Sequence, residues 1–187
     1  MKKMAILLIV LMVISAGFLC GCNEETEEEI DYVDANLNVL GLTVDDLSGD
    51  FVISGETYKS TPYYIEGGFF DGTRVSESYA VNFTESDTSL ITEFLIRYES
   101  KEECKSVLDT VKTELSGDFP EISVSIIGDD SYFGQKTYTV LGSEVSLYLL
   151  CFRTADVLVM LTGTAPLQVT FRGYGNIIES NINAVLK

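Results

Sequence analysis

Short segments in which apolar and polar residues alternate dominate the chain from about residue 37 onward. Alternation with a period of two is typical of strands that bury one face. Two segments, 145–153 and 157–162, are apolar almost throughout and are joined by Thr154-Ala155-Asp156, which predicts a hairpin of central strands. In all, the pattern predicts strands at 51–54, 63–66, 75–83, 90–98, 122–126, 137–141, 145–153 and 157–162.

Two segments show the helical spacing instead. Ser100-Lys-Glu-Glu103 has the form of a capping box and Gly117 the form of a stop signal, so we expect a helix between them. The apolar positions of this helix, Cys104, Val107, Leu108, Val111 and Leu115, share one face. Residues 174–186 repeat that spacing. Strands, helix, strands and helix in this order predict an α+β fold: a mostly antiparallel sheet of about six to eight strands packed by two main helices.

The N-terminus has the pattern of an export signal. Lys2 and Lys3 precede an apolar run from Met4 to Leu19, which at 16 residues is shorter than the roughly 20 that a spanning helix needs. The run ends in Leu19-Cys20-Gly21-Cys22, which resembles the lipobox of prokaryotic lipoproteins. This resemblance implies that Cys22 is lipidated and becomes the N-terminus after cleavage, so the protein would attach to the membrane through its lipid.

Two alternatives to this interpretation remain open. If Cys20 were the modified residue, Phe18 and Leu19 would precede the cleavage point, where small side chains are typical. An uncleaved signal would instead act as a membrane anchor by itself.

The charge is uneven along the chain and negative overall. The 187 residues have 12 Lys and Arg against 29 Asp and Glu, a formal charge of −17. Removal of residues 1–21, which contain Lys2 and Lys3 and no acid, would leave 166 residues with a charge of −19. Because residues 22–36 are rich in Glu and Asp and repel one another, we interpret them as an extended tether. The predicted organisation is a signal peptide at 1–21, an acidic tether at 22–36 and a single domain at 37–187.

The amino-acid composition excludes several classes of function. The chain has no His, which excludes Ser-His-Asp and Cys-His catalytic sets and imidazole metal ligands. A surface this acidic repels phosphate backbones, so we expect no nucleic-acid partner.

A second resemblance extends over about residues 37–187. The capped helix with Ser-Lys-Glu-Glu-Cys, the turn Ile126-Ile-Gly-Asp-Asp-Ser-Tyr132, the following hairpin and the C-terminal amphipathic helix are similar to PsbP/Mog1/LpqN-type domains of exported and lipid-anchored proteins. That group shares a fold better than it shares a function. The resemblance therefore implies a binding or accessory role and transfers no catalytic residue.

The acidic residues give no catalytic or metal motif. Asp45, Asp46 and Asp50 surround one turn and Asp129-Asp130 opens another, but calcium-loop spacing is absent, so turn formation explains them better. We expect no metal, no cofactor and no catalytic residue. The alternative is a small secreted hydrolase that uses Asp and Glu carboxylates; two of them about 5 to 10 Å apart in a concave site would favour it.

Aromatic residues offer the main hint of a binding surface. Tyr58, Tyr63, Tyr64, Phe69 and Phe70 lie close together in a stretch with glycines and few charges. If exposed, they would suit a peptide, glycan or protein partner; the simpler interpretation is that about half of them belong to the core.

Two further modifications follow from an extracytoplasmic location. Cys104 on a helix face and Cys151 on a central strand form a candidate disulfide, although free buried thiols are a common alternative. Asn82-Phe83-Thr84 is a glycosylation sequon, and alternation places Asn82 opposite Val81 and Phe83. Together these patterns predict a lipid-anchored extracytoplasmic binding or accessory protein without catalytic activity.

Overall fold

The computed structural model describes residues 33–66, 70–86, 89–140, 142–164 and 168–186. Six antiparallel strands form one sheet in the order β1-β4-β5-β8-β7-β6, and β2 pairs with β3 in a small second sheet. The strands are β1 (Val52–Lys59), β2 (Tyr63–Tyr64), β3 (Arg74–Val75), β4 (Glu77–Ser86), β5 (Ser89–Arg97), β6 (Asp130–Val140), β7 (Ser143–Thr154) and β8 (Val157–Thr164). The helices are α2 (Lys101–Leu115) and α3 (Gln168–Asn183), with two single 3-10 turns, η1 (Leu37–Val39) and η2 (Val44–Asp46). These elements confirm the predicted α+β class, sheet and single domain.

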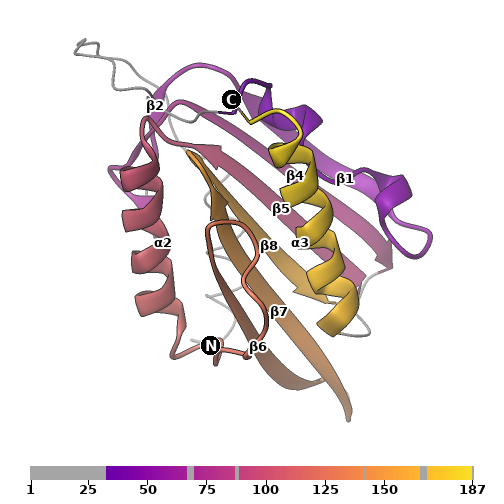
Figure 1. Cartoon of the computed structure of the whole chain (residues 1–187). Helices are drawn as coiled ribbons and strands as arrows, with labels where there is room; N and C mark the ends of the chain where they lie inside the picture. The colour runs from indigo at the N-terminus through magenta and orange to yellow at the C-terminus, as the bar shows by residue number, and fades with distance from the viewer. Residues whose placement is uncertain (1–32, 67–69, 87–88, 141, 165–167, 187) are drawn as a thin grey trace.

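The two long helices cover opposite faces of the sheet (Figure 1). Side chains along a strand alternate between faces, and β7 follows this rule closely. Leu150 and Phe152 lie in the hydrophobic cluster under α3, whereas Leu149 and Cys151 lie in the cluster under α2. Both faces of the central strands are therefore buried, as their near-continuous apolarity predicted.

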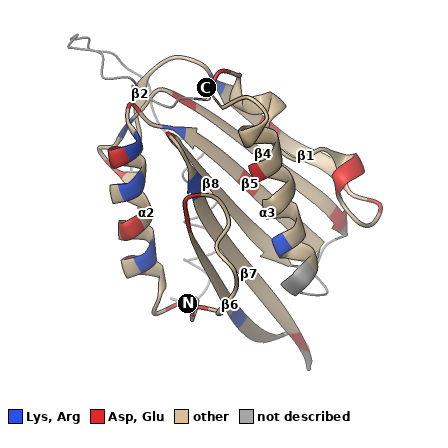
Figure 2. Ribbon diagram, in the orientation of Figure 1, with Lys and Arg blue, Asp and Glu red and all other residues tan. Residues whose placement is uncertain are grey.

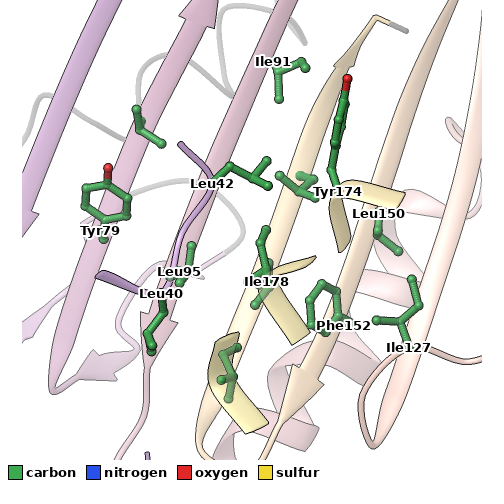
Figure 3. Packing of buried hydrophobic residues seen from close by; sticks show 14 of the residues in the cluster. Leu40, Leu42, Tyr79, Ile91, Leu95, Ile127, Leu150, Phe152, Tyr174 and Ile178 are labelled. Carbon is green, nitrogen blue, oxygen red and sulfur yellow. The ribbon is translucent and has the colours of Figure 1, made fainter. Parts of the chain in front are cut away.

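Residues 33–47, which we call the N-terminal segment, share the first face with α3. Leu37, Leu40 and Leu42 from this segment pack with Ile178 of α3 and with Leu95 of β5 (Figure 3). The second face is completed by the β2–β3 hairpin, which adds Ile65, Phe70 and Val75 to the cluster under α2. One face is thus closed by α3 and the N-terminal segment, and the other by α2 and the β2–β3 hairpin.

The structure corrects several boundaries expected from the sequence, and β6 begins at Asp130 rather than at 137. Residues 122–126 are not a strand: Ile122 and Val124 pack against the core, but only Glu121 forms an isolated bridge, with Gly134. The second helix begins at Gln168 rather than at 174. Residues 33–36 belong to the body rather than to a tether, because Val33 is only 2% exposed and bridges Leu186.

The predicted N-terminal cap of α2 at Ser100 is present in the structure. The backbone N–H of Glu103 donates to Ser100 Oγ at 3.1 Å, and α2 follows immediately. No helix among the described residues has the length and apolarity needed to cross a membrane. The predicted signal peptide and Cys22 lie outside the described residues.

The Gly128-Asp129 turn fastens the β7–β8 hairpin. Gly128 has a φ of +65°, and a Cβ at this position would overlap the carbonyl oxygen of Arg153. Asp129 Oδ2 accepts from the N–H of Ala155, at 3.0 Å, and Ala155 itself has a positive φ. The Gly-Asp-Asp motif noted in the sequence thus has a structural role: it supports the strained turn of the β7–β8 hairpin.

Substitution of this glycine should separate backbone strain from steric overlap. We expect Gly142→Ala, at φ +84° in open space, to lower the free energy of unfolding by about 1 kcal/mol. Gly128→Ala should lower it further, by ~2 kcal/mol or more in total, because the methyl group also meets the Arg153 carbonyl. Urea titration measures both variants. Equal losses would contradict the close contact.

Candidate functional site

The predicted aromatic residues do not form one surface. Tyr58 is 37% and Tyr64 50% exposed, whereas Tyr63 is half-buried and Phe70 belongs to the core. Phe69 lies outside the described residues. Tyr58 lies on the sheet face of Tyr79, its partner in β4, whereas Tyr63 and Phe70 lie with the cluster under α2. The interpretation that about half of these residues are core is therefore the better one.

The most organised polar site is a buried cluster around Arg97 at the end of β5. Its Nη1 contacts Glu77 Oε2 at 2.5 Å, and its Nη2 donates to the Ala35 carbonyl at 2.6 Å. Its Nε lies 3.6 Å from Asp156 Oδ2. Both acidic residues are about 95% buried, so this pair of carboxylates offsets a cation that the core would otherwise exclude.

The same carboxylates hold the N-terminal segment. The N–H of Leu37 donates to Glu77 Oε1 at 2.8 Å, and the N–H of Val33 donates to Asp156 Oδ1 at 3.3 Å. Burial raises the pKa of Asp156, while Arg97 and the Val33 amide act in the opposite direction. Because each carboxylate forms an ion pair with Arg97 and accepts a backbone amide of residues 33–47, the cluster clamps the segment to the strands. We call Glu77, Arg97 and Asp156 the clamp.

Glu93 is a third acidic residue beneath the N-terminal segment and has no cation beside it. It is fully buried on β5, and its Oε2 accepts from the N–H of Leu42 at 3.0 Å. Its Oε1 has no hydrogen-bond partner among the described residues. Burial raises the pKa of Glu93 to about 8, helped by the nearby charge of Asp46 and only partly opposed by the Leu42 amide.

Gly41 explains how the chain fits over this carboxyl group. A Cβ at Gly41 would overlap Glu93 Oε1 and come within 3.0 Å of the Tyr79 ring. The segment can therefore lie directly on the sheet only with glycine at this position. The result is a tight cover over an acidic side chain rather than a cavity.

Three of the five acids considered as metal ligands have structural partners in the structure. Asp129 Oδ2 contacts Arg153 Nη1 at 3.0 Å, and Asp130 Oδ2 contacts Lys112 Nζ at 2.6 Å. Asp46 Oδ2 accepts from Thr43, completing a capping box at η2. No group of three metal-ligating side chains occurs in the part of the chain that the structure describes.

A shallow polar hollow of about 640 Å³ lies along the outer surface of α2. Its described lining comes from this helix alone, with Glu102, Lys105 and Asp109 among the residues. One face of one helix does not enclose a substrate, so the hollow does not provide the concave, two-carboxylate site that a hydrolase would need.

Cys104 and Cys151 lie in the same core cluster under α2 but are not bonded to one another in the structure, which carries both as free, buried thiols. Burial raises the pKa of both thiols, that of Cys151 to about 12. Tyr98 lies near them: its pKa is raised first by burial and then by the two cysteines. Neither thiol is a nucleophile near neutral pH, because the thiolate is the reactive form. The disulfide stays a prediction.

Asn82 lies on the face opposite Val81 and Phe83, as alternation predicted. It is half-buried in β4, between β1 and β5, and its Oδ1 accepts from Thr92 Oγ1 at 2.8 Å. The folded sheet therefore already engages the side chain of the predicted glycosylation site.

Comparison with known proteins adds a shared fold. No protein-family model and no curated protein matches the chain. Among solved structures, the extracellular domain of PknH from Mycobacterium tuberculosis matches with a TM-score of 0.58 and 8% identity, covering 82% of this chain and 99% of that domain. At this identity the likeness shows the fold alone.

Sequence reasoning missed the clamp and Glu93. The available signal was a charged residue inside an otherwise apolar strand, as for Glu93 between Ile91 and Leu95. The alternation indicates which side of the sheet such a residue faces, but not that the chain from residues 33–47 lies over it.

Glu93 should make stability depend on pH between about 4.5 and about 8. In this range the unfolded chain ionises Glu93 while the folded chain keeps it protonated, so the free energy of unfolding falls as pH rises. We expect Glu93→Gln to remove this fall and to be the more stable protein at pH 8. Urea unfolding at several pH values measures it, with the exposed Glu102→Gln as control. Parallel pH profiles for wild type and Glu93→Gln would refute the assignment.

The predicted disulfide is tested by counting thiols. We expect no free thiol from Cys104 or Cys151 when the mature protein is isolated without reductant, unfolded and alkylated. The bond would close a loop of 47 residues between positions 104 and 151 and stabilise the fold by about 3 to 4 kcal/mol in the chain-entropy model. Two alkylated thiols in the unreduced protein would establish the free state that the structure carries.

Proposed function

We propose that the protein is a lipid-anchored extracytoplasmic domain that binds a partner at the cell surface and has no catalytic centre. In this proposal Cys22 carries the lipid, and the acidic residues after it connect the anchor to the folded body. The domain then acts as a tethered binding module on the outer side of the membrane.

The observation that carries this proposal is the attachment of the chain at Val33, where the tether would join the folded domain. Val33 is buried, bridges Leu186 and donates its N–H to Asp156 within the clamp. Only ten residues separate Val33 from Cys22, a reach of at most about 40 Å. In this proposal the clamp holds residue 33, the point at which the tether joins the folded domain.

The use of the buried acids supports a role without catalysis. Glu77, Glu93 and Asp156 each accept a backbone amide of the N-terminal segment. Because the segment lies over them, these carboxylates are not open to a substrate. No observation on the described residues favours the hydrolase alternative over the binding module.

Two observations support the proposal that the protein is exported. Residues 1–22 resemble a lipoprotein signal, and the solved structure with the same fold is described as an extracellular domain. Both agree with an extracytoplasmic binding or accessory role, and neither identifies the partner.

Two single substitutions test the anchor. We expect Cys22→Ser to abolish lipidation, so the variant should leave the detergent phase in a phase-partition experiment and lack the mass of the lipid. Cys20→Ser is the matched control, two residues away, and should partition like the wild type. If Cys22→Ser still enters the detergent phase, the apolar run itself is the anchor. If Cys20→Ser loses the lipid, Cys20 is the modified residue.

A further inference from the structure

One edge of the six-stranded sheet is formed by β1. Within the described residues β4 is the only strand that pairs with β1, through positions Val52 to Lys59. An edge strand has backbone N–H and C=O groups on its outer side that another extended chain can pair with. This side of the sheet is therefore available for an added strand.

The opposite edge is protected by the chain itself. The outer side of β6 is covered in its first half, where the N–H of Ile122 donates to the Phe133 carbonyl at 2.7 Å and the N–H of Gln135 donates to the Pro120 carbonyl at 3.1 Å. Residues 119–122 thus occupy part of the edge that a partner strand would need. The contrast between the two edges identifies β1 as the site of pairing.

Three apolar side chains of β1 are exposed at this edge. Val52 is 60%, Ile53 49% and Tyr58 37% exposed. Natural edge strands are commonly protected by charged residues, proline or bulges. In β1 one irregularity lies between Ile53 and Gly55, after which the strand pairs regularly to Lys59. The exposed apolar residues therefore offer cross-strand contacts to a partner.

The charge around this edge selects the kind of partner. Four exposed acidic side chains lie on β1 itself or next to its beginning: Asp45, Asp50, Glu56 and Glu85. Figure 2 shows red at η2 and at the neighbouring ends of β1 and β4. The basic residue of the strand, Lys59, lies at its other end, with its Nζ 4.4 Å from the centre of the Tyr63 ring. A basic segment fits this surface electrostatically.

A second copy of the chain fits less well. Each copy would add a formal charge of −17, which opposes association.

We propose that the open edge of β1 receives an extended, basic segment of a partner protein as a seventh strand of the sheet. This inference rests on the proposed binding function and specifies its surface. Backbone hydrogen bonds to β1 hold the segment, its apolar side chains contact Ile53 and Tyr58, and its Lys or Arg side chains face the acidic residues.

The experiment uses the detergent-solubilised full-length protein and a capped eight-residue peptide of alternating Val and Lys. We expect the peptide to bind, to lose at least tenfold in affinity at high salt, and to protect the amides of residues 52–59 from hydrogen exchange. The same peptide with two adjacent central amides N-methylated should bind at least tenfold more weakly, because neither of its edges can then form a continuous ladder. A Val-Glu peptide should likewise bind at least tenfold more weakly.

A matched pair of variants locates the site. Val52→Ser combined with Ile53→Ser removes one Val and one Ile from β1, and should weaken peptide binding at least tenfold. Val39→Ser combined with Ile126→Ser removes the same two residue types at 65% and 68% exposure elsewhere and should leave binding unchanged. Because all four side chains are largely exposed, both variants should fold.

Three results would overturn the proposal. They are absence of binding by the Val-Lys peptide, protection at residues other than 52–59, and equal affinity for the Val-Glu or N-methylated peptide. A dimer formed through β1 without peptide would assign the edge to a second copy instead. Detergent partitioning of Cys22→Ser is independent of all these outcomes, so failure of the edge proposal and failure of the anchor are distinguishable.

Discussion

The compensation of one partly buried cation, Arg97, whose side chain is 19% exposed, is the interaction on which the arrangement of the chain depends. A guanidinium inside a protein requires acidic partners and hydrogen-bond acceptors, because the loss of its hydration is otherwise too costly. Arg97 of β5 obtains them from Glu77 of β4, Asp156 before β8 and the Ala35 carbonyl. Three separate parts of the chain thus meet at one charge, which joins the strands and fixes where the N-terminal segment begins.

The clamp in turn completes the hydrophobic core. With Val33 and Leu37 held by carboxylates, the chain that follows lies over β4 and β5 and contributes Leu37, Leu40 and Leu42 to the cluster under α3. This arrangement has an energetic cost at Glu93, whose carboxyl group is enclosed with one unpartnered oxygen. The apolar burial by the three leucines offsets that cost, so the segment that completes the core also encloses Glu93 of β5, a carboxyl group whose pKa is raised by burial.

The polar interior and the open edge have separate roles in this view of the protein. Acids in the interior are engaged with the protein's own backbone, and Asp129 is engaged with the β7–β8 turn. What the surface offers is a strand edge with exposed apolar side chains and acidic neighbours. A module that binds through its backbone edge needs no cleft, which is consistent with the binding role proposed.

Local patterns in the sequence were sufficient to predict most of the helices and strands and the fold class. Alternation along residues 75–83 and 90–98, the capped helix after Ser100 and the apolar pair of strands near the C-terminus all identify structure from neighbours close in the chain. The segment 122–126 shows where this fails: its alternation is real, but it bonds to β6 only at its beginning, through Ile122, so it packs as an irregular chain. Pairing partners are set by the tertiary structure.

The residues of the clamp could not be predicted from the sequence for the same reason. Glu77, Arg97 and Asp156 are separated by up to 79 positions, and no spacing rule links them. Only the strand order, which places β5 between β4 and β8, brings them together. The sequence by itself determined most of the strands, the cap of α2 at Ser100 and the acidic character, because each depends on residues near one another. The tertiary structure decided which charges are buried, which thiols are neighbours and which edge stays open, because these depend on contacts between distant parts of the chain.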